Sequence, residues 1–153
     1  MKQLPIICLE SIGPIKLGAS RPEIRRTLEE GGYPYKLSRK SLDFFCDAAI
    51  QVEYIEDTAS FIGVSFHSSY TCTYQGVNVF DTPAEELFFL VASAEGDDPT
   101  HTFNHYGYVF PKQILSLWEA DSQYDYLGGE IRPMWGQVGI GDARYLAATA
   151  KYR

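Results

Sequence analysis

Two histidines, His101 and His105, form the pattern in this sequence that is best suited to bind a metal ion. Histidines four positions apart on one helix face can hold zinc, and Asp97 and Asp98 would add oxygen ligands. The glutamate that zinc peptidases carry between such histidines is absent, and a nearby proline and asparagine indicate a loop. A small metal-binding or hydrolytic enzyme that uses this region is therefore one alternative, although the residues favour a solvated polar loop.

Two candidate nucleophiles lack the sequence context that catalysis needs. Ser65 stands in the sequence GVSFH, which misses the second glycine of a nucleophile elbow, and the alternating pattern around it predicts a strand. Cys72 has no histidine at a motif spacing, and on a tyrosine-flanked strand it is best explained as a small core residue. We therefore predict that the protein is not an enzyme and holds no metal or other cofactor.

An acidic, tyrosine-rich segment between Trp118 and Glu130 is the strongest candidate for a functional surface. Carboxylates form charge-assisted bonds with lysine and arginine, and aromatic rings offer these cations a favourable face. A solvated acidic loop explains the charges alone equally well. The residues that we predict to bind a partner are Glu119, Asp121, Tyr124, Asp125, Tyr126 and Glu130, with Asp97 and Asp98 as a second group.

The negative charge of the chain is concentrated in its middle. The 153 residues carry a net charge of −7, and residues 76–130 alone carry one basic and ten acidic groups. Residues 1–75 are nearly neutral, and residues 131–153 are basic. Because an acidic field repels phosphate and attracts cationic proteins, we predict a basic protein as the partner and no nucleic acid.

The first helix that must position these segments begins at Ser20. Ser20 and Glu23 form a capping box before an apolar face, and Gly31 ends the helix. On the solvent face, we expect Arg25 to pair with Glu29 one turn later.

The second helix is predicted to begin at Thr82. Thr82 would cap the helix, Pro83 would take its first position and Glu85 would complete a capping box. Residues 87–92 are apolar on all sides, which predicts a helix deep in the core or beneath a partner, and Gly96 ends it.

Alternating apolar and polar residues predict strands elsewhere in the chain, at residues 42–46, 50–55, 61–66, 70–74, 106–110, 114–118 and 136–141. We predict a single α+β domain over residues 1–153, with antiparallel sheet and two main helices packed on one face. The order of helix and strands in residues 12–75 resembles that in residues 76–153, which favours a duplicated helix-plus-meander unit, with coincidence as the alternative.

The N-terminal sequence and the cysteines bear on location. The apolar run after Lys2 is too short for a signal peptide, and no window reaches the roughly 18 apolar residues of a membrane span. Three cysteines at wide spacings indicate buried thiols in a reducing compartment. We therefore expect a cytoplasmic protein that does not bind a membrane.

Short motifs along most of the chain resemble a family of small bacterial proteins. They lie at residues 13–20 (GPIKLGAS), 43–45 (DFF), 50–54 (IQVEY), 74–77 (YQGV), 85–87 (EEL), 108–111 (YVFP), 115–118 (LSLW) and 135–140 (WGQVGI). The family includes immunity proteins of contact-dependent inhibition and of related polymorphic toxin modules. The resemblance implies a cytoplasmic inhibitor that binds a cognate toxin domain, and it implies no catalytic residue.

Charge, tyrosines and resemblance together lead to one main hypothesis. The protein is expected to be an immunity-type binding protein that neutralises a basic toxin domain through its acidic, tyrosine-rich surface. A homo-oligomeric structural module, whose tyrosines face a second copy, is the other alternative.

Overall fold

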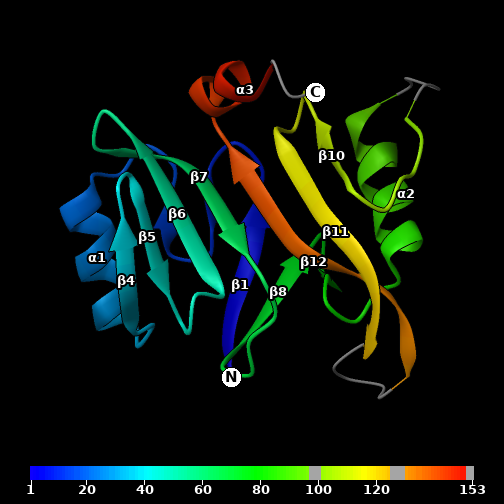
Figure 1. The fold of residues 1–153 in the computed structure, drawn as a ribbon, viewed down its shortest axis with the longest axis horizontal. Helices are drawn as coiled ribbons and strands as arrows, with labels where there is room; N and C mark the ends of the chain where they lie inside the picture. The colour runs from blue at the N-terminus through cyan, green and yellow to red at the C-terminus, as the bar shows by residue number, and fades with distance from the viewer. Residues whose placement is uncertain (97–100, 125–129, 151–153) are drawn as a thin grey trace.

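The computed structural model describes residues 1–96, 101–124 and 130–150, and within them the chain forms two β-sheets and three helices (Figure 1). The larger sheet has seven antiparallel strands in the order β10-β11-β12-β7-β6-β5-β4. Their bounds are β4 Tyr35–Arg39, β5 Leu42–Phe45, β6 Ile50–Ile55, β7 Thr58–Val64, β10 Gly107–Phe110, β11 Leu115–Tyr124 and β12 Ile131–Gly141. The predicted α+β class is confirmed.

The smaller sheet has five strands in the order β3-β2-β1-β8-β9. Its central strands β1 and β8 pair in parallel, which the predicted antiparallel pattern did not include. A parallel pair needs a long crossover, and here most of the first half of the chain forms it. The bounds are β1 Lys2–Ile7, β2 Ser11–Ile12, β3 Ile15–Lys16, β8 Tyr70–Tyr74 and β9 Val77–Asn78.

Helix α1 (Arg21–Glu30) begins where the capping pattern predicts. The Ser20 hydroxyl oxygen accepts a hydrogen bond from the Glu23 backbone N–H at 3.3 Å, and Gly31 follows the last turn. Ile24 and Leu28 are buried beneath the helix, as their spacing requires.

Helix α2 (Ala84–Glu95) begins without the predicted capping box. The Thr82 hydroxyl donates instead to the backbone carbonyl of Asn78 at 2.7 Å, and Pro83 occupies the cap position without a side-chain bond. The prediction failed because a threonine hydroxyl can also bond to the preceding turn. The helix ends at Gly96, as predicted, with a φ of 114°.

The core lies between the two sheets, with α1 and α2 on the same side of the larger sheet. Tyr108, Leu117, Val138, Val64 and Ile50 follow one another across that sheet and face this core. The third helix, α3 (Ala143–Thr149), was not predicted. It lies on the opposite side, where Tyr145 stacks on Phe61 with ring centres 4.5 Å apart.

Some strands lie at their predicted ranges and others were missed. Strands β6 and β8 have the predicted bounds, whereas β1 and β4 were missed. Strand β11 continues to Tyr124, so the first half of the acidic segment is a strand rather than a loop. Antiparallel meanders follow both α1 and α2, and they join where β7 pairs with β12. The internal duplication stays a prediction.

Candidate partner-binding surface

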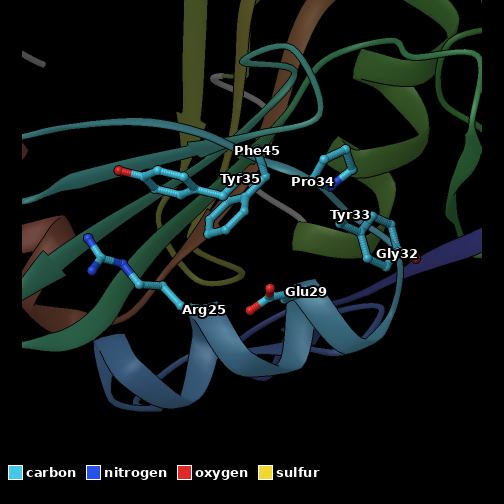
Figure 2. A pocket seen from close by; sticks show the side chains of 7 residues that line it. All are labelled: Arg25, Glu29, Gly32, Tyr33, Pro34, Tyr35 and Phe45. Carbon is cyan, nitrogen blue, oxygen red and sulfur yellow. The ribbon is translucent and has the colours of Figure 1, made fainter.

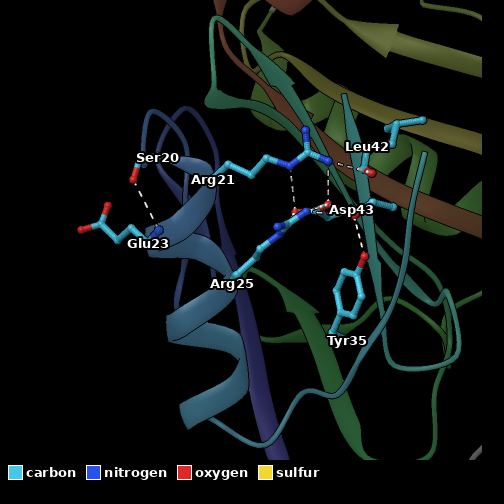
Figure 3. A network of polar contacts seen from close by, with 8 residues as sticks. Ser20, Arg21, Glu23, Arg25, Tyr35, Leu42 and Asp43 are labelled. Carbon is cyan, nitrogen blue, oxygen red and sulfur yellow. Dashed lines mark hydrogen bonds and ion pairs between the residues drawn. The ribbon is translucent and has the colours of Figure 1, made fainter. Parts of the chain in front are cut away.

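A network of charged residues, which we call the Asp43 network, joins α1 to β5 (Figure 3). Asp43 is fully buried, and its two carboxylate oxygens accept bonds from both Arg21 and Arg25 at 2.8–3.3 Å. The Ser38 hydroxyl donates to the same carboxylate at 2.5 Å and contacts the Tyr35 hydroxyl at 2.7 Å. Arg25 therefore pairs with Asp43, and the expected ion pair with Glu29 does not form in the described structure.

The electrostatics of the Asp43 network indicate a structural role. Burial alone would raise the pKa of Asp43, but the bonds from Arg25, Arg21 and Ser38 outweigh it and hold the pKa well below its ordinary value. Burial, followed by the negative charge of Asp43, raises the pKa of the neighbouring Tyr54. A carboxylate whose oxygens are already occupied is poorly placed to take a proton from a substrate.

A groove of about 710 Å³ lies next to this network, between α1 and the chain that enters β4 (Figure 2). Arg25 and Glu29 rise from the helix on one side, and Tyr33, Tyr35 and Phe45 line the other side. Arg25 lies over the Tyr35 ring at 5.6 Å, so one end of the groove is cationic and aromatic.

A larger groove lies on the other side of the seven-stranded sheet, where α3 covers only one end. We call this surface the open face. It has a volume of about 960 Å³. Its middle row follows the cross-strand partners Gln51, Gly63, Gly139, Ser116 and Val109, which are mostly small residues. The surface is therefore recessed in the middle and is bordered by larger side chains.

Glycines allow the aromatic rings of the open face to lie flat on the sheet. A Cβ atom on Gly139 would lie 2.4 Å from the Phe61 ring, and one on Gly107 would lie 2.6 Å from the Trp118 ring. Covering a glycine in a strand with a neighbouring ring stabilises the sheet. It also leaves the outer side of Trp118 uncovered, since this residue is 54% exposed.

Three polar side chains in the middle of the open face have no bonding partner in the described chain. Glu53, Gln51 and Gln137 line the groove and form no hydrogen bond or ion pair with any described residue. Glu53 is also the single charged residue in the described lining. Polar side chains without a described protein partner are available to a binding partner.

The acidic hairpin, formed by residues 119–124 of β11 and residues 130–135 before and within β12, extends from the Trp118 end of this face. Glu119 has a positive φ of 49°, and its N–H donates to the carbonyl of Tyr106 beyond the last pair of β10 and β11. This kink lets the hairpin leave the plane of the sheet and curve toward α2 (Figure 1).

Three of the predicted partner-binding residues lie on this hairpin and are exposed, namely Glu119, Asp121 and Glu130. Tyr124 is the last residue of β11, and its side chain lies outside the described atoms. Asp125, Tyr126, Asp97 and Asp98 lie outside the described residues. The structure thus places one set of acidic residues, Glu119, Asp121 and Glu130, on the hairpin beside the open face. Their predicted grouping with Asp97 and Asp98 stays a prediction.

The residues of the alternative enzyme hypothesis do not converge in the described part of the chain. His101 Nδ1 lies 2.5 Å from the Tyr108 hydroxyl, and the described residues contain no cluster of three potential metal ligands. Ser65 follows the end of β7, and no helix begins there. Burial raises the pKa of Cys72 to about 12, so its thiol is a weak nucleophile.

Sequence reasoning missed the residues that make the open face a site. Trp118 was placed at the start of the acidic segment, but Glu53, Gln51 and Gln137 belong to strands far apart in the chain. One signal was present: the glycines at 63, 107 and 139 stand within strands, where a glycine often marks close approach of another group.

Comparison with protein-family models, with curated proteins and with solved structures gave no match. No helix in the described part of the chain is long and apolar enough to cross a membrane. The site must therefore be interpreted from its own chemistry.

Proposed function

We propose that the protein is an immunity-type binding protein, which neutralises a cognate toxin domain by covering it with the open face and the acidic hairpin. The observation that carries this proposal is the position of Trp118. Its half-exposed ring lies between a groove on one side and exposed carboxylates on the other. Aromatic anchors next to complementary charge are typical of the residues that dominate protein–protein affinity.

The size of the open face favours a protein partner over a small molecule. Glu53 on β6 and Trp118 on β11 lie three strands apart and four residues apart along the strands. At about 4.8 Å per strand and 3.4 Å per residue, this diagonal is roughly 20 Å. A metabolite would contact one corner, whereas a polypeptide segment of the partner reaches both.

The charge of the surface favours a basic partner. Glu119, Asp121 and Glu130 are exposed, and Glu53 is unpaired within the described chain. A basic toxin domain, such as one that binds nucleic acid, carries the complementary charge. Opposite charges of this kind increase the association rate and make it depend on salt.

Action in the cytoplasm is part of the same proposal. All three cysteines, Cys8, Cys46 and Cys72, are free thiols in this structure. Free thiols are typical of proteins in a reducing compartment, which is where a toxin that enters a cell would meet its inhibitor.

The test uses the toxin domain encoded in the reading frame next to the gene for this protein. Calorimetry would measure its affinity for the wild-type protein, for Trp118→Ala and for Phe89→Ala. Phe89 is a matched control because it is also half exposed, at 49%, but lies on α2 away from the open face. We expect Trp118→Ala to weaken binding about 30-fold, which corresponds to about 2 kcal/mol, and Phe89→Ala to have little effect. Equal affinities for all three proteins would refute the proposed surface.

A further inference from the structure

The groove of about 710 Å³ beside the Asp43 network lies at an unpaired edge of the larger sheet. Strand β4 ends the order of the seven strands, and all five of its side chains are exposed. An edge strand presents backbone N–H and C=O groups that can pair with another extended segment. The groove of about 710 Å³ runs next to this edge and is bordered by α1 on its other side.

This corner of the molecule is basic although the protein as a whole is acidic. Residues 21–43 carry six basic and four acidic groups, compared with a net charge of −7 for the chain. Arg21 and Arg25 share the single carboxylate of Asp43, so the buried network itself keeps one positive charge. Lys36 and Arg39 on the edge strand, with Lys40 directly after it, add exposed positive charges.

Arg25 connects the buried network to the groove. Its Nε and Nη2 atoms bond to Asp43 and Ser38, whereas Nη1 forms no hydrogen bond with any described residue. The guanidinium group is thus held in place from one side and has a free amino group on another. A fixed guanidinium group of this kind is well suited to bind a carboxylate.

We propose that β4 is a docking edge for an acidic, extended segment of another protein, which joins the sheet as a further strand and places a carboxylate beside Nη1 of Arg25. Backbone pairing would supply affinity, and the groove would select the side chains that point toward α1. Glu29 lines the far end of the groove, so the preferred carboxylate lies at the Arg25 end.

Other occupants fit this edge less well. Two copies of β4 would place Lys36 and Arg39 near their own counterparts, and lysines on an edge are a common device against self-pairing. A bulge between Tyr35 and Leu37 further disfavours regular pairing of two identical edges. The same positive charges attract an acidic strand, which makes a partner of opposite charge the consistent choice.

The test uses the full-length, isotope-labelled protein and a short synthetic peptide, TVEVEVT, with TVKVKVT as the control. We expect amide resonances of residues 35–39 to shift with the acidic peptide and their hydrogen exchange to slow. The amides of β10, at the other edge of the sheet, stay unchanged. Slower exchange separates strand addition from charge contact alone, because only backbone pairing protects the amides.

Charge reversal locates the effect. The double variant Lys36→Glu/Arg39→Glu is expected to weaken peptide binding about tenfold. Lys16→Glu/Lys112→Glu makes the same change in net charge at exposed sites elsewhere and should retain most of the affinity. Equal losses in both variants, or exchange protection that maps to another strand, would overturn the proposal. So would concentration-dependent oligomers that dissociate in Lys36→Glu/Arg39→Glu, because the occupant would then be a second copy.

Discussion

The Asp43 network and the open face lie on opposite sides of the same sheet, and they use polar side chains in opposite ways. Asp43 is buried, and its oxygens are occupied by two arginines and a serine. Glu53, Gln51 and Gln137 of the open face bond to no described residue. Polar groups that bond to one another fix the fold, whereas polar groups left to water remain available for a partner.

The aromatic residues follow the same division. Trp135 is 1% exposed, and its ring N–H donates to the carbonyl of Ala84 at 2.8 Å, which ties β12 to α2. Trp118 belongs to the neighbouring strand β11, yet it lies on the open face over Gly107. Two tryptophans on paired strands are thus expected to serve stability in one case and binding in the other.

The largest effect is expected from removing the central charge of the network. Asp43→Asn keeps the shape of the side chain but turns an amide toward two arginines, so we expect a loss of about 3 kcal/mol in the free energy of unfolding. Asp47→Asn is the matched control, because Asp47 pairs with His67 at the surface and is 80% exposed. It should cost less than about 1 kcal/mol. If urea unfolding shows similar losses of stability for Asp43→Asn and Asp47→Asn, the Asp43 network does not stabilise the fold.

A comparable loss in the free energy of unfolding is expected when Trp135 is replaced, but not when Trp118 is replaced. Trp135→Ala should destabilise the protein by about 3 kcal/mol, because it removes a buried ring and a buried hydrogen bond. Trp118→Ala should change the free energy of unfolding by less than about 1 kcal/mol. Thermal unfolding of the two variants checks this difference. A large loss of stability in Trp118→Ala would mean that the Trp118 ring stabilises the fold, as the Trp135 ring does.

Lowering the pH should reveal how much the Asp43 network stabilises the wild-type protein. Because the folded-state pKa of Asp43 lies below its unfolded value, the stabilisation is fully present above about pH 4. It is lost as the pH falls through the folded-state pKa, where Asp43 becomes protonated. The pKa of Asp142 is also lowered in the folded state, so the free energy of unfolding should still decline somewhat with falling pH when Asp43 is replaced. Urea unfolding between pH 5 and pH 2.5 should therefore show a shallower decline for Asp43→Asn than for the wild type; equal slopes would contradict this assignment.

Local patterns predicted the parts of this fold whose causes are local. The Ser20 cap, the buried face of α1 and the bounds of β6 and β8 depend on residues a few positions apart, and all are confirmed. Strand β4 was missed because its five side chains are exposed and show no alternation. Arg25 was assigned to Glu29 because a helix makes that pair neighbours, but Asp43 offers a buried carboxylate that water does not compete for.

The candidate site shows the same limit. The acidic residues were found because they are close together in the sequence. The open face was not found, because Glu53, Phe61, Trp118 and Gln137 become neighbours only through the pairing of β6, β7, β12 and β11. Long-range strand pairing is fixed by tertiary packing and leaves little trace in a local pattern.

The smallest effect on stability, and the sharpest test of the acidic hairpin, is expected from its exposed carboxylates. Asp121→Ser and Glu130→Ser should each change the free energy of unfolding by less than about 0.5 kcal/mol, since both side chains are exposed. In stopped-flow experiments with the toxin domain, the double variant should associate more slowly and depend less on salt. The dissociation rate should change little, because charges at the rim of an interface act mainly on the approach of the partner. If the association rate and its salt dependence stay at wild-type values, the hairpin is a solvated acidic surface and the open face alone carries the interaction.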